Sequence, residues 1–147
     1  MPTVRVVSSP GAITVVYLND AAVGRGGVNR REDVLLVQYF LNAMWGKLRD
    51  KAGKTFGSGA APKVDGVCGP ITVGAIETFQ KWYYEGAFAD GRVDFVPPGH
   101  RTGSLSNNPY TILGINVNYG FTFGRDRHLA LFREPNFPAV LTPSLFA

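Results

Sequence analysis

Hydrophobic positions follow different patterns along the chain, and each pattern predicts a different kind of element. Near the N-terminus, residues 4–7 and 12–18 are rich in β-branched side chains, and the turn-forming sequence Ser8-Ser9-Pro10-Gly11 separates them. This arrangement is typical of a β-hairpin. Because an isolated hairpin is marginally stable in water, we expect it to pack on the rest of the chain or on a partner. Residues 19–28, which contain three glycines, are predicted to form a flexible connector.

A helical period follows the connector. Apolar residues recur at steps of three and four and form a stripe that faces a core, namely Val34, Val37, Leu41, Met44 and Leu48. Leu36 and Phe40 lie on an adjoining face, so we expect this helix to be buried broadly. The helix is predicted to start at Asn29, because Asn29 and Glu32 have the spacing of a capping box.

A second helix is predicted from Pro70 to Gly86. Gly69 can supply a turn conformation closed to other residues, and Pro70 at the first helical position loses no hydrogen bond. The expected core stripe consists of Ile71, Ala75, Phe79 and Trp82, widened by Ile76 and Tyr83. Gly86 is a natural helix stop.

The last third of the chain changes pattern twice. A third helix is predicted near Asn108-Pro109, although Gly114 weakens it by about 1 kcal/mol relative to alanine. From Phe121 onward the chain is apolar and irregular, and its prolines rule out a continuous helix. We expect an extended tail that wraps the body or lies in a groove of another chain.

Composition sets the class of protein. With 147 residues, of which 45% are hydrophobic, the chain can bury one core. This composition indicates one domain, and the element patterns above make it mainly α-helical at residues 29–120, preceded by the hairpin and connector at 1–28 and followed by an apolar tail at 121–147.

The charge is mildly basic and scattered. The net charge is +4, and no basic run interleaved with aromatic residues appears, so we expect no nucleic-acid binding. No apolar stretch approaches membrane-spanning length, so we expect no membrane partner. Residues 46–63 carry five basic residues and one acid. This segment is either a solvated insertion or a basic arm over an anionic ligand.

Reactive and metal-binding residues are few. Cys68 is the only cysteine and the two histidines are far apart in sequence, so no internal disulfide and no zinc site of ordinary spacing is expected. We expect no cofactor. Each candidate acid has a structural role available, so catalysis is not the favoured function; these acids are Glu32, Asp33, Asp65, Glu77, Glu85, Asp90 and Asp94.

One motif points beyond a globular fold. The chain reads VDG-x-x-GP-x-T-x-x-A-I-x-x-FQ from Val64 to Gln80, and this pattern resembles the signature of the peptidoglycan-binding domain family. Residues 33–42 also resemble that family's V-x-x-LQ-x-x-LN helix. The resemblance implies a three-helix module that holds bacterial cell-wall glycopeptide, and it implies that the motif residues build the fold; these are Gln38, Asp65, Gly66, Gly69, Pro70, Thr72, Phe79 and Gln80.

The family also has a second turn that forms a pseudo-repeat with the first. Asp90-Gly91 resembles the start of that turn, but the Gly-Pro-x-Thr that should follow is replaced by residues 95–99. The resemblance places the ligand groove near this turn. Because Trp82, Tyr83 and Tyr84 are consecutive and aromatic rings stack on sugars, we expect these three residues, with Asp90 and Gly91, to bind the ligand.

Three functions follow from these patterns. The favoured one is a non-catalytic module that binds peptidoglycan or muropeptide. The alternative is a structural adaptor that uses the same fold as a scaffold and binds a protein partner, or its own copies, through the hairpin and the tail. A wall hydrolase is the third. The N-terminus lacks the features of a signal peptide, so we expect cytoplasmic synthesis and association with a virion or a secretion machine.

Overall fold

The predicted N-terminal hairpin is confirmed. The computed structural model describes residues 2–9, 12–49, 53, 55–57, 59–97 and 110–146. Strand β1 (Thr3–Ser9) pairs antiparallel with β2 (Ala12–Leu18), with Thr3 opposite Leu18 and Ser9 opposite Ala12. The tip at Pro10-Gly11 lies outside the described residues. As expected for a hairpin, this one packs on the body: β2 contacts α3, and Tyr17 is buried.

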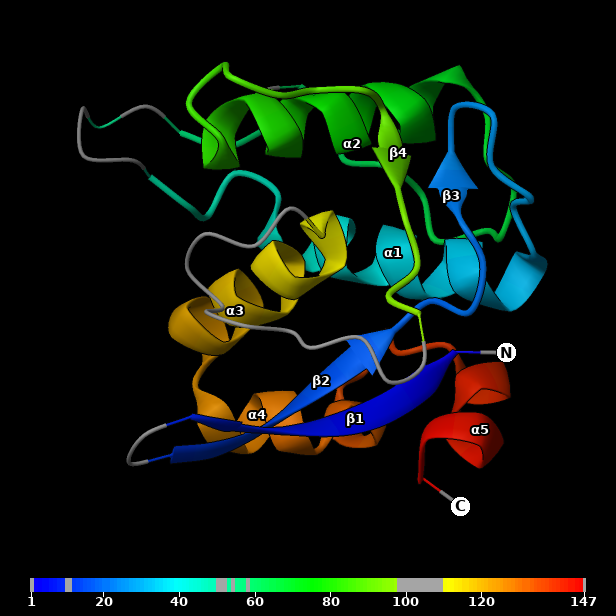
Figure 1. The fold of residues 1–147 in the computed structure, drawn as a ribbon, viewed down its shortest axis with the longest axis vertical. Helices are drawn as coiled ribbons and strands as arrows, with labels where there is room; N and C mark the ends of the chain where they lie inside the picture. The colour runs from blue at the N-terminus through cyan, green and yellow to red at the C-terminus, as the bar shows by residue number, and fades with distance from the viewer. Residues whose placement is uncertain are drawn as a thin grey trace.

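The predicted flexible connector is wrong, because part of it is a paired strand. Strand β3 (Val23–Gly24) pairs antiparallel with β4 (Arg92–Val93) in a second two-stranded sheet, visible at the upper right of Figure 1. Val23 and Val93 are fully buried. Asn19 adds a hydrogen bond from its side-chain amide to the carbonyl oxygen of Val93, at 3.0 Å. The segment is therefore a packed part of the structure, and Gly24 lies in the strand itself.

Helix α1 (Arg31–Met44) is buried along most of its length, as the sequence predicts. Its start differs, because Asn29 does not cap it. Asn29 has a φ of 57°, and its side chain bonds the backbone of Gly24 and Gly27 instead. The fully buried Asp33 carboxylate accepts hydrogen bonds from the backbone N–H groups of Asp20 and Ala21, at 2.8 and 3.1 Å. The first turn of α1 is therefore fastened to residues 20–21 rather than capped.

Helix α2 (Pro70–Tyr83) starts at the predicted proline. It ends near Gly86, whose φ of 82° and hydrogen bond to the carbonyl of Lys81 terminate the helix. The predicted stripe is shifted at its start, because Ile71 is 72% exposed and Thr72 is buried in its place. The buried residues of α2 are Thr72, Ala75, Ile76, Phe79 and Gln80.

Helix α3 (Thr111–Phe123) supplies the third long helix, and the predicted start at Asn108-Pro109 lies outside the described residues. Gly114 has a packing role that the sequence did not reveal. A Cβ at this position would lie 2.6 Å from the ring of Tyr83, the last residue of α2, so the glycine makes room for this ring against α3. Because α3 continues to Phe123, the predicted boundary at residue 120 falls inside a helix; the division into domains stays a prediction.

The C-terminal tail packs on the body, one of the two predicted alternatives, but its predicted extended form is wrong. The chain continues through short helical turns: α4 (Arg125–Leu129), the 3₁₀ turns η1 (Leu131–Arg133) and η2 (Ala139–Leu141), and α5 (Thr142–Phe146). The prolines prevent one continuous helix, as expected, but permit these turns. Apolar side chains of this segment are buried on the body, namely Leu131, Phe137, Leu141 and Leu145.

In Figure 1, α2 lies on one side of α1, and the hairpin and the C-terminal turns lie on the other, where α4 contacts α3 and η2 contacts α1. One core runs through these elements and includes residues of β2, α1, α2, α3 and the C-terminal turns. Among the described residues, no helix has the length and apolar character needed to span a bilayer.

Candidate functional site

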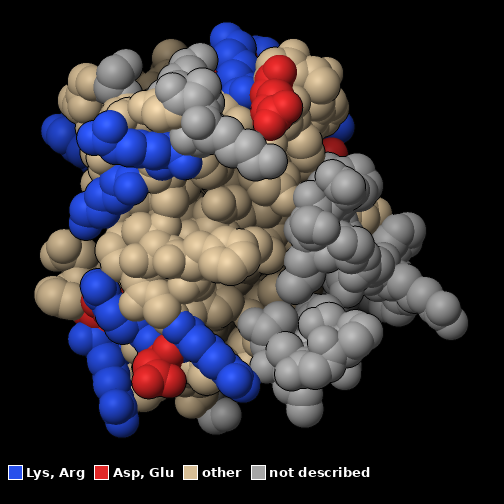
Figure 2. All heavy atoms as spheres, turned by 90° about the vertical axis from the view of Figure 1, so that its left-hand side faces the viewer, with Lys and Arg blue, Asp and Glu red and all other residues tan. Residues whose placement is uncertain are grey.

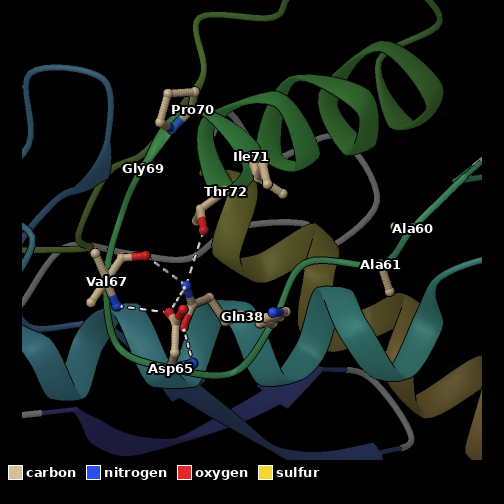
Figure 3. A pocket seen from close by; sticks show the side chains of 10 residues that line it. Gln38, Ala60, Ala61, Asp65, Val67, Gly69, Pro70, Ile71 and Thr72 are labelled. Atoms are coloured by element: carbon tan, nitrogen blue, oxygen red, sulfur yellow. Dashed lines mark hydrogen bonds between the residues drawn. The ribbon is translucent and has the colours of Figure 1, made fainter.

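Gln38, in the middle of α1, organises the turn that precedes α2. Its Nε2 donates to the Asp65 carboxylate, the Val67 carbonyl and the Thr72 hydroxyl, at 3.1, 3.0 and 2.9 Å. Its Oε1 accepts from the backbone N–H groups of Asp65 and Gly66, at 3.1 and 2.8 Å. Figure 3 shows this side chain at the centre of the turn. One buried amide therefore joins α1, the Asp-Gly turn and the first turn of α2.

Gln80, on α2, makes the equivalent contacts at the second Asp-Gly turn. Its Nε2 donates to the Asp90 carboxylate, the Arg92 carbonyl and the Thr111 hydroxyl, at 3.0, 3.0 and 3.1 Å. Its Oε1 accepts from the backbone N–H of Gly91 at 2.9 Å. The same scheme is thus used twice: a glutamine on one helix holds an Asp-Gly turn and a threonine at the start of the next helix.

The repeat explains why the second turn looked incomplete in the sequence. Thr72 follows Gly66 by six residues, whereas Thr111 follows Gly91 by twenty. Thr111 performs the role of Thr72 despite the intervening segment. Sequence reasoning missed Thr111 because the family motif places its threonine at a fixed distance from the Asp-Gly turn. The hydrogen bond from Gln80 requires only that a threonine stand at the start of the next helix, whatever the length of the segment between them.

The aspartates and glycines of the two turns also correspond. Asp65 accepts a hydrogen bond from the backbone N–H of Val67, and Asp90 accepts one from that of Arg92, each at 3.0 Å. The Val67 N–H and the Gln38 amide lower the pKa of Asp65 below its usual value. Gly66 and Gly91 have φ values of 78° and 71°, a region that favours glycine.

Gly69 does not have the role that the sequence predicted. Its φ is −107° and its ψ −170°, which is extended backbone open to any residue. A Cβ at Gly69 would meet no atom within 4 Å. The left-handed position of this turn is therefore Gly66, three residues earlier.

A cleft of about 370 Å³ lies beside the first turn. Ile71 projects from the first turn of α2 into the space between α2 and the segment that carries Ala60 and Ala61 (Figure 3). Val67 is also exposed, and Lys63 and Asp65 supply charge at the lining. The cleft thus offers exposed aliphatic side chains next to a polar turn.

The predicted aromatic ligand residues lie at the other end of α2. Because α2 has 14 residues, its ends are about 20 Å apart. Tyr83 stacks on Phe79 with ring centroids 5.5 Å apart, and Trp82 lies 5.9 Å from the same ring, so both are half-buried in an aromatic cluster. Tyr84 makes edge contacts with Tyr83 and with Phe88, at 4.8 and 5.4 Å.

The structure therefore divides the predicted ligand residues. It brings Tyr83 and Tyr84 together, and it uses Asp90 and Gly91 in the hydrogen bonds of the second turn. None of the five lines the cleft beside the first turn. Their ligand-binding role stays a prediction.

Most of the candidate acids have structural partners. Asp33, Asp65 and Asp90 accept backbone hydrogen bonds, as described above. Glu77 pairs with Arg25, and Asp94 pairs with Arg92 at 2.8 Å.

Metal ligands and reactive thiols give no further site within the described part of the chain. There, no group of three or more His, Cys, Asp or Glu side chains is placed to hold a metal ion. Cys68 is half-buried, and burial raises the pKa of its thiol, which disfavours the thiolate.

No family model, curated protein or solved structure matches this chain.

Proposed function

We propose that this chain is a non-catalytic module that binds bacterial peptidoglycan in the cleft beside the first Asp-Gly turn. The observation that supports it most is the repeated glutamine–turn–threonine arrangement of Gln38 and Gln80. The resemblance to the peptidoglycan-binding family implies such a pseudo-repeat. The motif residues Asp65, Gly66 and Thr72 belong to one hydrogen-bonded unit, which agrees with the structural roles that the resemblance gives them.

The chemistry of the cleft suits a glycopeptide. Exposed aliphatic side chains at Val67 and Ile71 offer apolar contact to sugar faces and to alanine side chains of a peptide. Lys63 and Asp65 at the lining offer one charge of each sign to peptide amide, amine or carboxyl groups. The hydrogen bonds of Gln38 and Thr72 hold the floor of the cleft in place, so its shape is preformed.

Retention on purified peptidoglycan sacculi tests the proposal. We compare the wild type with Ile71→Ser and with the matched control Val28→Ser, because Ile71 and Val28 are both exposed aliphatic side chains, at 72% and 68%. Only Ile71 lines the cleft. We expect Ile71→Ser to weaken retention by about tenfold and Val28→Ser to leave it unchanged. Retention no better than that of albumin at low salt, or equal loss in both variants, would contradict the proposal.

The structural adaptor remains a second candidate because of one exposed side chain. Phe121, near the end of α3, is 83% exposed and would offer its ring to another protein. If the chain self-associates there, Phe121→Ser should convert an oligomer to a monomer. Light scattering that finds only monomers of the wild type at high protein concentration would contradict self-assembly.

A further inference from the structure

A second cleft, of about 210 Å³, lies between the C-terminal halves of α1 and α3 and the residues that follow α4. Its volume equals that of about seven water molecules. It therefore admits a small chemical group or the end of a chain. Its polar and aromatic lining includes Tyr39, Lys47, Tyr119, Phe123, Arg127 and Glu134.

The cleft carries one uncompensated positive charge. Arg127 and Glu134 form a two-pronged ion pair, with N···O distances of 2.7 and 2.9 Å, so their charges cancel. Lys47 and Arg127 both lie against the ring of Phe123, at 5.1 and 4.6 Å from its centroid. In the part of the chain that the structure describes, no carboxylate pairs with Lys47.

Basic side chains also dominate this side of the molecule. The C-terminal end of α3 points to the left of Figure 1, and Figure 2 shows the face seen from there. Lys and Arg side chains form two groups on it, separated by an uncharged band, with few acidic side chains among them. An anion approaching this face meets a favourable field.

A pair of buried hydroxyls supplies a hydrogen-bond donor. Tyr39 and Tyr119 are almost fully buried, and their hydroxyl oxygens lie 3.0 Å apart. One of the two hydroxyl hydrogens forms the bond between them. The other has no acceptor among the described residues. Burial raises the pKa of both phenols, so both keep their protons at neutral pH.

We propose that this cleft binds the terminal carboxylate of a peptide. The Lys47 ammonium pairs with the carboxylate, and the remaining hydroxyl hydrogen of the Tyr39–Tyr119 pair donates to it. One net positive charge matches a monoanion, whereas a phosphate monoester would bring nearly two negative charges. The site shares no lining residue with the cleft at Ile71, so it can be occupied whether or not that cleft binds the wall. The peptide end comes either from a wall stem peptide, which ends in D-alanine, or from a protein.

Isothermal titration of the full chain tests the site with four probes. These are N-acetyl-D-alanyl-D-alanine, N-acetyl-L-alanyl-L-alanine and the C-terminal amide of each. We expect at least one acid to bind and its amide to bind about tenfold more weakly, because the amide lacks the charge. Preference for the D,D or the L,L acid identifies the source as wall or protein.

Matched variants locate the binding. Lys47→Gln should weaken binding of the acid by about tenfold. Lys81→Gln, which removes the same charge from an exposed position on α2 outside the cleft, should leave it unchanged. The double variant Tyr39→Phe/Tyr119→Phe, which removes both hydroxyls, should weaken binding of the acid more than that of the amide, whereas either single variant leaves one hydroxyl hydrogen to donate.

Several results would overturn the proposal: no binding of either acid, equal binding of acid and amide, or an unchanged affinity in Lys47→Gln. The soluble peptides are titrated without sacculi, and Ile71 does not line this cleft, so loss of peptide binding and loss of sacculus retention in Ile71→Ser are separate results.

Discussion

Gln38 and Gln80 show how much one buried side chain can determine. Each amide bonds a helix, a turn and the start of the next helix at once, and each is almost fully buried. Buried amides of this kind are costly unless all their partners are present. Gln38 therefore sets the position of the first turn and Gln80 that of the second. Gly66 and Gly91 allow the backbone of each turn to adopt the conformation that these hydrogen bonds require.

Two alanine substitutions distinguish the roles of Gly66 and Gly69 in the first turn. Gly66→Ala should lower the free energy of unfolding by about 1–2 kcal/mol, because alanine is strained at positive φ. The added Cβ would also lie 2.8 Å from Cγ of Arg31. Gly69→Ala should change stability by less than about 0.5 kcal/mol. Urea denaturation measures both, and a larger loss in Gly69→Ala would show that the turn is misassigned.

His128 predicts a loss of stability in acid. Its Nε2 lies 2.9 Å from Oδ1 of Asn116, an amide whose orientation is fixed by both backbone groups of Tyr17. Burial lowers the pKa of His128 from 6.5 to about 4. The folded state therefore holds the neutral ring while the unfolded state becomes protonated below pH 6.5. Stability is fully present above pH 6.5 and should fall by about 3 kcal/mol between pH 6.5 and 4.

The variant His128→Gln removes this titration. Its unfolding free energy, measured by urea denaturation from pH 7.5 to 4, should be lower at neutral pH but should decline less steeply on acidification. A slope as steep as that of the wild type would assign the acid sensitivity to other groups.

At the scale of elements, the contact between the end of α2 and α3 depends on one glycine. The ring of Tyr83, the last residue of α2, packs on α3 at Gly114, where a side chain is missing. The sequence pattern gives only the intrinsic cost of glycine in a helix, and that cost is offset here by the packing of a large aromatic ring. At this residue, helix propensity thus favours alanine, whereas the packing of the Tyr83 ring favours glycine.

A matched pair of substitutions in α3 tests this contact. Gly120→Ala should stabilise the protein by up to about 1 kcal/mol, because no atom would lie within 4 Å of its Cβ. Gly114→Ala should destabilise it by about 1–3 kcal/mol, because the Cβ overlaps the Tyr83 ring. In a protein that already carries Tyr83→Leu, Gly114→Ala should destabilise less, because the large ring is gone. Thermal unfolding of the two glycine variants, Tyr83→Leu and the double variant measures the coupling energy between residues 83 and 114. Additive effects of Gly114→Ala and Tyr83→Leu would contradict the contact.

At the scale of the whole molecule, local periodicity predicted the hairpin and the bodies of the helices well. These elements follow from side-chain patterns within a few residues. The β3–β4 pair and the buried C-terminal turns could not be predicted in this way, because they depend on contacts between segments distant in sequence. Of the candidate site, Gln38, Asp65 and Thr72 came from the motif. The exposed Ile71, the role of Thr111 and the second cleft required the fold.

Gln38→Leu and Gln80→Leu should each lower the free energy of unfolding by about 2–4 kcal/mol, since each leaves several buried polar groups without partners. Because both turns are attached to α2, we expect one cooperative transition in each variant, seen identically by circular dichroism and tryptophan fluorescence. Two separate transitions would show that the turns belong to independently folding units.

The shared helix has one more consequence. Thr72 and Gln80 lie on the same helix of 14 residues, so the two turns cannot rotate relative to each other unless that helix bends. The surfaces at its two ends are therefore preorganised with a fixed separation and orientation. A rigid, elongated ligand of matching length would bind the surfaces at both ends of α2 with little loss of conformational entropy in the protein. A shorter or flexible ligand would gain binding energy from the surface at only one end.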